Sequence, residues 1–296
     1  MSMLDRLGVC SWSLQAKSPL DLATKIKAVG VSLVQLHLDP VREGGDWRAD
    51  QAVGRMKDRG IRIVSGMMGM KDEDYSSLET IAATGGVRPD ATWPDNLRAA
   101  EGNALMAARL GLSLVTFHAG FLPHEAGNAE RHKMIDRLRQ LAEVFAARNV
   151  RVGLETGQES AKTLLGVLDE VNAPLPARAQ VGVNFDPANM ILYGMGDPLE
   201  SLKLLAPFVL QLHLKDALPT KTKGTWGEEM PAGKGAVDWK QFLAAADRLV
   251  PHVHVMIERE SGDARVNDAA EARAMVARHA GTPAHASAGV RGVAHV

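Results

Sequence analysis

The sequence predicts a single-domain α/β protein, a (β/α)8 TIM barrel. Eight short apolar segments alternate with amphipathic segments of helical periodicity over roughly 280 of the 296 residues. The apolar runs are nearly continuous, which is typical of parallel strands covered on both faces. An open doubly wound sheet is the alternative. It is disfavoured because Cys10-Ser11-Trp12-Ser13 follows the first strand, where a dinucleotide-binding sheet carries GxGxxG.

The elements can be placed in order from their start and stop residues. Ser18 and Pro19 are a typical N-cap and first helical residue, and Gly30 closes that helix. Asp197 and Glu200 have the spacing of a capping box. The predicted strands are residues 7–14, 32–38, 61–69, 114–120, 150–156, 181–185, 209–215 and 252–260. The predicted helices are residues 18–30, 47–59, 95–110, 131–148, 160–171 and 268–279, with two more beginning at Asp197 and Asp238.

Two segments interrupt this alternation. Residues 70–94 form a long connection rich in Asp, Ser, Thr and Gly, and connections of this length are usually lids or binding loops. Residues 281–296 carry little apolar periodicity. We therefore expect a barrel over residues 1–280, followed by a C-terminal tail that is disordered or packs on a neighbouring subunit.

Composition excludes several classes of protein. The 34 Lys and Arg residues nearly balance 35 Asp and Glu residues, which disfavours a nucleic-acid or anionic-membrane binder. Cys10 is the single cysteine, so no intrachain disulfide forms, as is common in a reducing compartment. The first residues lack the apolar core of a signal peptide, and no apolar run is long enough to span a membrane. These features predict a cytoplasmic protein.

Charged residues end four consecutive predicted strands. Glu155, Asp186, His213 and Glu258 each interrupt an apolar run at its last positions, each roughly one strand–helix unit after the one before. In a barrel of this kind, strand ends converge on one mouth, where catalytic groups lie. Three converging carboxylates would repel one another without a cation. We therefore expect one divalent metal ion, with Mn²⁺ favoured and Mg²⁺, Co²⁺ or Zn²⁺ possible for this hard ligand set.

Several short motifs surround these strand ends. They are Gly153-Leu154-Glu155, Asn184-Phe185-Asp186-Pro187-Ala188-Asn189, His213-Leu214-Lys215-Asp216, Gly233-Lys234-Gly235-Ala236-Val237-Asp238-Trp239 and Ile257-Glu258. With these motifs in this order, the sequence over most of residues 5–280 resembles the xylose isomerase-like TIM-barrel superfamily of sugar phosphate isomerases and epimerases. The resemblance implies that the four strand-end residues bind the metal and that the two glutamates also move protons. Members of the superfamily often form dimers or tetramers, so a homodimer or homotetramer is expected.

The chemistry follows from the residue types. A metal that chelates two adjacent oxygens stabilises an enediolate, formed when a proton is removed beside a carbonyl. Glu155 and Glu258, on opposite sides of the mouth, can serve as base and acid. The resemblance implies that the substrate is a small sugar or sugar phosphate. Return of a proton on the opposite face gives epimerisation, and return to the neighbouring carbon gives aldose–ketose isomerisation. Loss of a β-hydroxyl would instead give dehydration. The residues leave these outcomes open.

Five further residues are candidates for contact with the substrate. His118 ends the fourth strand and either contacts substrate or is a core histidine. Asn189 and Lys215 can bond hydroxyls or a carbonyl, although a strand-end lysine is often simply solvated. Glu260 should share the face of Glu258, since side chains alternate along a strand. Trp12 either stacks on a sugar or packs at the barrel end.

One loop resembles a phosphate-binding turn. Gly233-Lys234-Gly235, with Lys221 and Lys223 nearby, would suit a phosphate group, although a lone GxG is a weak signal.

Three alternative functions remain. A keto-sugar or inosose dehydratase would use the same metal site. A phosphodiesterase similar to endonuclease IV is disfavoured, because Asn189 stands where that family has a histidine and residues 227–229 lack its Asp-x-His. A sugar-binding barrel without catalysis is the third alternative.

Overall fold

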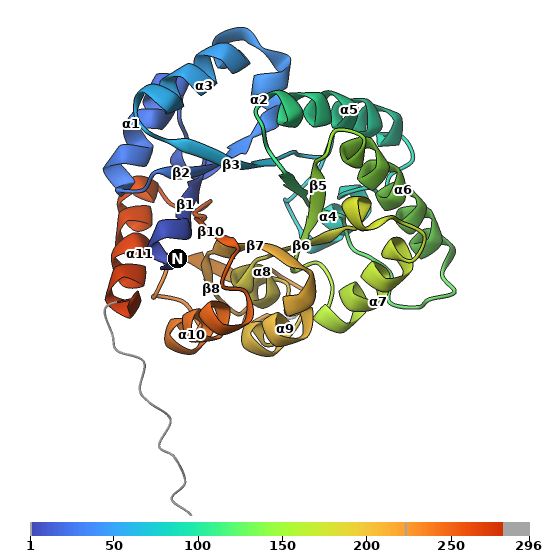
Figure 1. The fold of residues 1–296 in the computed structure, drawn as a ribbon. Helices are drawn as coiled ribbons and strands as arrows, with labels where there is room; N and C mark the ends of the chain where they lie inside the picture. The colour runs from blue at the N-terminus through green and yellow to red at the C-terminus, as the bar shows by residue number, and fades with distance from the viewer. Residues whose placement is uncertain (1, 223, 281–296) are drawn as a thin grey trace, which may run out of the picture.

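The computed structural model describes residues 2–222 and 224–280. Eight parallel strands close into one barrel in the order β1-β10-β7-β6-β5-β4-β3-β2, which confirms the predicted fold. Helices surround the barrel (Figure 1). The expected C-terminal tail at residues 281–296 lies outside the described residues. The barrel strands are β1 (Leu7–Cys10), β2 (Leu33–His37), β3 (Arg62–Met67), β4 (Leu114–Phe117), β5 (Arg151–Glu155), β6 (Gly182–Phe185), β7 (Val209–Leu214) and β10 (His254–Ile257).

The outer helices match the predicted ones, and shorter elements join them. The main helices are α1 (Pro19–Val29), α3 (Ala49–Asp58), α5 (Trp93–Arg109), α6 (Ala129–Ala146), α7 (Ala161–Asn172), α9 (Pro198–Leu205), α10 (Trp239–Leu249) and α11 (Arg265–Ala280). The short helices in the loops are α2 (Leu38–Glu43), α4 (Leu78–Thr84) and α8 (Pro187–Leu192). Single 3₁₀ turns occur at Leu4–Arg6, Trp12–Leu14, Gly45–Trp47, Ala177–Ala179 and Ala206–Phe208.

Helix ends follow the expected chemistry with one exception. The Ser18 side chain accepts a hydrogen bond from the amide of Asp21, and Gly30 ends α1 with a φ of 84°. Asp197 caps α9 by accepting from the amide of Glu200. The predicted capping box is wrong in its second half, because the Glu200 carboxylate accepts instead from Lys203 Nζ at 2.6 Å.

Two predicted boundaries also need correction. The first strand ends at Cys10 rather than at residue 14, because the chain turns into a 3₁₀ helix at the mouth. The connection at residues 70–94 is not irregular throughout. It contains α4, whose start is a capping box between Ser77 and Thr80.

A polar layer crosses the middle of the barrel, although the strands look almost uniformly apolar in sequence. Ser65 Oγ donates to Gln211 Oε1 at 2.6 Å, and Gln211 Nε2 donates to Gln35 Oε1 at 2.8 Å. Gln35 Nε2 donates to Thr116 Oγ1 at 2.8 Å. Buried polar groups cost free energy unless they are hydrogen-bonded, so these contacts make the layer tolerable. The five side chains of this interior polar layer, all with no exposed surface, are Gln35, Ser65, Thr116, Asn184 and Gln211.

A small hairpin stands beside the barrel mouth. It pairs β8 (Asp216–Leu218) with β9 (Glu228–Met230) in antiparallel register. The buried carboxylate of Asp216 holds the segment that follows, accepting from the amides of Gly233, Gly235 and Val237 at 2.8, 3.0 and 3.2 Å. It also accepts from the indole N–H of Trp239 at 2.8 Å. One side chain thereby ties the hairpin to the start of α10.

Asp216→Ala should lower the free energy of unfolding by about 3 kcal/mol, because it leaves several buried donors without an acceptor. Urea denaturation measures this loss. Asp238→Ala is the matched control, since Asp238 is exposed and caps α10 by accepting from the amide of Gln241, so it should cost about 1 kcal/mol. Equal losses in the two variants would contradict the anchoring role of Asp216.

Candidate active site

The four predicted strand-end residues converge on one point. Glu155 ends β5, Asp186 follows β6 as the N-cap of α8, His213 lies in β7, and Glu258 follows β10. The Nδ1 atom of His213 lies 3.3 Å from Glu155 Oε1, 3.6 Å from Asp186 Oδ2 and 3.1 Å from Glu258 Oε2. One donor atom from each of the four residues lies within 4.8 Å of the others, and all four residues are buried. The barrel topology thus assembles a set of side chains that are up to 103 residues apart in sequence (258 − 155).

The free atoms of this cluster suit a divalent cation. Asp186 Oδ1 accepts from the amides of Ala188 and Asn189 at 2.7 and 3.0 Å. Asp186 Oδ2 and His213 Nδ1 are buried, have no hydrogen-bond partner among the described residues, and both face the centre of the cluster. A buried polar atom normally has a partner. Three carboxylates and one imidazole therefore fit a hard divalent ion such as Mn²⁺ or Mg²⁺.

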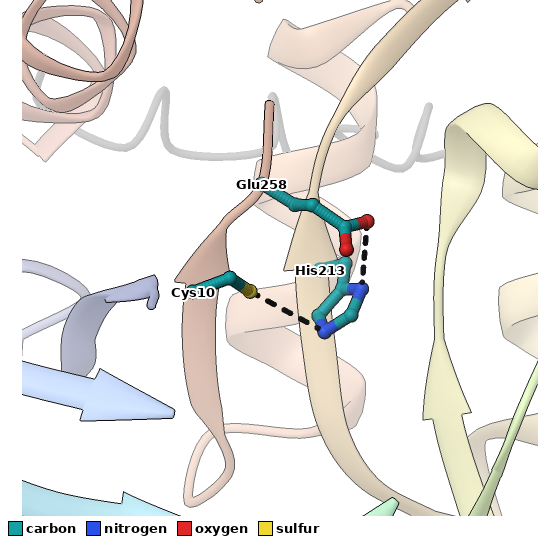
Figure 2. Close-up of side chains that lie close together, drawn as sticks. All are labelled: Cys10, His213 and Glu258. Carbon is teal, nitrogen blue, oxygen red and sulfur yellow. Dashed lines mark hydrogen bonds and ion pairs between the residues drawn. The ribbon is translucent and has the colours of Figure 1, made fainter. Parts of the chain in front are cut away.

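The two nitrogens of His213 face different surroundings (Figure 2). Nδ1 faces the Glu258 carboxylate, whereas Nε2 lies 3.7 Å from Cys10 Sγ, deeper in the barrel. Burial raises the pKa of the Cys10 thiol to about 12. In the metal-free protein the thiol is therefore protonated near neutral pH.

Neighbouring cations keep the two glutamates ionised. Burial opposes the ionisation of Glu155, but the charges of His118 and His213 hold its pKa below the ordinary value. Burial likewise opposes ionisation of Glu258, and Lys215 and His213 together lower its pKa. Both carboxylates are therefore available as proton acceptors near neutral pH.

Lys215 and Glu260 lie beside Glu258. Lys215 is buried, and its Nζ lies 3.1 Å from Glu258 Oε2 and 2.5 Å from Glu260 Oε2. Glu258 and Glu260 therefore both face Lys215, although strand alternation does not explain this because β10 ends at Ile257. Arg259 turns the other way and pairs with Glu229 at 2.7 Å, which ties β9 to this loop. Contact of Lys215 or Glu260 with substrate stays a prediction.

Trp12 and Asn189 each hold one of the two glutamates. The indole N–H of Trp12 donates to Glu258 Oε1 at 2.7 Å, and Asn189 Nδ2 donates to Glu155 Oε1 at 3.0 Å. These bonds fix the orientation of both carboxylates. Whether either residue also touches a sugar stays a prediction.

His118 joins the cluster to an aromatic group that sequence reasoning did not find. Its Nε2 lies 3.6 Å from Glu155 Oε1, and its ring centroid lies 6.3 Å from that of Tyr75. Tyr75 stacks on Trp226 at 6.5 Å, and Trp226 meets Tyr193 edge-on at 4.9 Å. The connection at residues 70–94 and the β8–β9 hairpin therefore meet beside the mouth. A role of the 70–94 connection as a lid or binding loop stays a prediction.

The Gly233-Lys234-Gly235 loop does not offer a cradle for phosphate. Its glycine amides donate to Asp216, and the amide of Lys234 donates to the carbonyl of Pro231 at 2.9 Å. A phosphate would need those same N–H groups. The interpretation of this loop as a backbone phosphate site is therefore wrong.

Fold and site together define the chain as a (β/α)8 barrel with a buried cluster of three carboxylates and one histidine at its mouth. The chain belongs to the family described as Xylose isomerase-like TIM barrel, whose model matches residues 23–279. No protein of curated function matches it in sequence. In the described part of the chain, no helix is both long and apolar enough to cross a membrane.

Solved structures agree with this assignment. The chain is similar to a xylose isomerase domain protein from Planctomyces limnophilus, with 29% identity, a TM-score of 0.78, and coverage of 86% of this chain and 91% of the other. It also resembles in fold the probable 3-DHS dehydratase AsbF from Bacillus anthracis, with 17% identity, a TM-score of 0.69, and coverage of 92% and 98%. An L-ribulose 3-epimerase matches with 16% identity, a TM-score of 0.70, and coverage of 95% of each chain.

The melting temperature should rise when Mn²⁺ is added to the metal-free protein, because the ion binds only the folded ligand set. At a hundredfold excess over Kd the gain is about 2.7 kcal/mol. Asp186→Ala should abolish the rise, since it removes a ligand oxygen that has no other partner. Asp136→Ala, which removes an exposed carboxylate on α6, is the control and should leave the rise intact. The same rise in the Asp186 variant would place the ion elsewhere.

Glu159 gives a prediction for pH. Burial alone raises the pKa of this loop carboxyl to about 8, and no hydrogen bond to it is found in the described part of the chain. Between the ordinary value of 4.5 and about 8, the unfolded chain has lost this proton while the folded chain keeps it. Stability therefore falls as pH rises through this window. Glu159→Gln should gain on the order of 3 kcal/mol at pH 8 and almost nothing at pH 4. Urea unfolding at both pH values measures this, and an equal effect at both would contradict it.

Proposed function

We propose that this protein is a divalent-metal-dependent sugar isomerase or epimerase that moves a proton beside the carbonyl of a small sugar. The observation that carries the proposal is the pair of buried glutamates, Glu155 and Glu258, that face the same nitrogen of His213 from β5 and β10. Both have lowered pKa values and both are held in orientation by a donor. Epimerases among the structures of similar fold, such as the L-ribulose 3-epimerase, support this class of reaction.

The residues divide the work between binding and proton transfer. Glu155, Asp186, His213 and Glu258 would hold the ion, which supplies Lewis-acid stabilisation of the negative charge that develops beside the carbonyl. One ionised glutamate removes the proton, and the other, after it has taken up a proton from solvent, returns that proton on the opposite face or at the neighbouring carbon. Lys215 keeps Glu258 ionised until it accepts a proton.

The aromatic group beside the mouth would line the substrate site. Tyr75, Tyr193 and Trp226 come from three separate loops and lie next to His118. Aromatic faces pack well on the C–H faces of sugars and exclude water from the reacting centre. His118 Nδ1 and Trp226 Nε1 are buried and have no hydrogen-bond partner within residues 2–222 and 224–280, so either N–H could bond a hydroxyl after a small shift.

Two expectations about the whole molecule belong with this proposal. We propose that the enzyme is cytoplasmic and that it assembles as a homodimer or homotetramer. Light scattering of the full chain tests the second expectation.

A keto-sugar dehydratase is the second candidate, and the similarity in fold to the probable 3-DHS dehydratase AsbF favours it. The same glutamate would remove the proton, but a β-hydroxyl would then leave as water. A phosphodiesterase similar to endonuclease IV needs three metals. The described residues offer the four-ligand cluster and one overlapping group formed by Cys10 with His213 and Glu258, which supports a single ion.

Incubation with Mn²⁺ and a panel of ketoses in deuterated water should give deuterium at the carbon next to the carbonyl. NMR separates a new epimer, an aldose and a dehydrated product, and so decides between the candidates. Binding of a sugar without exchange would favour a non-catalytic sugar-binding barrel.

Glu155→Gln and Glu258→Gln should each lower the rate of exchange by about 10²–10⁴-fold, because each removes one partner in proton transfer. The control is Glu79→Gln, an exposed carboxylate at the start of α4. Full turnover by either site variant would overturn the assignment of roles. Because both residues are also proposed ligands, Mn²⁺ affinity is measured in parallel to separate lost binding from lost proton transfer.

A further inference from the structure

The interior polar layer contacts the face of His213 that points away from the carboxylates. Gln35 Oε1 lies 2.9 Å from His213 Nε2, and Asn184 Nδ2 lies 3.0 Å from the same nitrogen. These two neighbours make opposite demands. The oxygen requires a proton on Nε2, whereas the amide N–H would donate to a bare Nε2. The state of His213 therefore depends on which neighbour prevails.

The orientation of Gln35 is set by the groups around its amide. Gln35 Nε2 lies 3.3 Å from the carbonyl oxygen of Gly66, which can only accept a hydrogen bond. The amide nitrogen therefore points at β3 and the amide oxygen points at His213. Gln211 Nε2 donates to that oxygen at 2.8 Å, which supports the same orientation. Gln35 thus presents a fixed acceptor to the imidazole ring.

The amide of Asn184 forms hydrogen bonds with residues other than His213. Its Nδ2 donates to Glu155 Oε2 at 3.2 Å, and its Oδ1 accepts from Gln211 Nε2 at 3.2 Å. The carboxylate is the stronger acceptor because it is charged. Asn184 is therefore satisfied without His213, whereas the oxygen of Gln35 at 2.9 Å repels an unprotonated Nε2.

We propose that Gln35 is a positioning residue that keeps the proton of His213 on Nε2 and so presents the lone pair of Nδ1 to the divalent ion. A metal-binding histidine needs its second nitrogen fixed by an acceptor, and that acceptor sets both tautomer and ring orientation. Here the acceptor is a neutral glutamine from β2, which is not one of the strands that carry the four ligands. The inference rests on the proposed metal site, not on the identity of the sugar.

The test compares Mn²⁺ binding and the state of His213 in four forms of the full chain. Gln35→Met removes the acceptor at similar volume, and should weaken Mn²⁺ binding by about 10–100-fold in calorimetry. Gln35→Glu keeps an oxygen facing His213 and, as the protonated acid whose O–H can donate to the carbonyl of Gly66, should restore most of that affinity. Ser65→Ala is the matched control, since Ser65 belongs to the same layer and bonds Gln211 but not His213, so it should bind Mn²⁺ as the wild type does.

The spectroscopic signature is read with Mg²⁺ on protein labelled with ¹⁵N-histidine. In the wild type and in Ser65→Ala, Nε2 of His213 should carry a slowly exchanging proton. In Gln35→Met this proton should exchange faster, because its acceptor is gone. A merely structural role for Gln35 would change the melting temperature without this difference between the variants.

Several outcomes would overturn the proposal. These are unchanged Mn²⁺ affinity in Gln35→Met, an equal loss in Ser65→Ala, or metal bound to Nε2 with the proton on Nδ1 in the wild type. The wild-type spectrum decides the last point even if Gln35→Met fails to fold. None of these measurements uses a sugar, so failure to turn over any ketose would refute the proposed function and leave this inference standing.

Discussion

The convergence of three carboxylates on one imidazole nitrogen is the constraint on which the rest of the site depends. Glu155, Asp186 and Glu258 each have an oxygen within 3.6 Å of His213 Nδ1, and all three side chains are buried. Like charges this close and this deeply buried repel strongly, and each also loses its hydration. The arrangement is tolerable only if positive charge lies among them. Lys215 supplies part of it, protonated His213 adds to it in the metal-free protein, and a divalent ion would take the place of the proton on His213 Nδ1.

The surrounding hydrogen bonds fix the orientation of the carboxylates and of the imidazole ring. Asp186 Oδ1 accepts from the first amides of α8, which leaves Oδ2 to face the centre of the cluster. Trp12 and Asn189 each take one oxygen of a glutamate. Below them, Gln35 meets the far nitrogen of His213. Each of these donors or acceptors removes one alternative orientation, so the free atoms that remain all face one point. Such preorganisation is what a catalytic or metal site needs from its scaffold.

The barrel makes this arrangement of side chains possible because its closed topology pairs every strand edge and leaves the strand ends free for function. The loops at the mouth then add groups from distant parts of the chain. Tyr75 from the 70–94 connection meets Trp226 from the hairpin, and Arg259 ties the loop after β10 to Glu229. Asp216, next to the site residue Lys215, accepts hydrogen bonds from amides of the loop before α10. Neighbouring residues in one motif thus serve separate purposes, one at the site and one in the scaffold.

The sequence by itself determined the barrel and its ligand candidates, because apolar periodicity, caps and strand-end charges are local signals. Glu155, Asp186, His213 and Glu258 stand out since a charge that ends an apolar strand is visible without any partner. The sequence did not reveal that the glycine amides of the 233–235 loop donate to Asp216, nor that the Glu200 carboxylate accepts from Lys203. Tertiary structure decided those bonds, and also the meeting of Gln35 with His213, 178 residues apart. A hydrogen bond between distant residues depends on strand register and barrel closure, and neither leaves a trace in the spacing of residues along the chain.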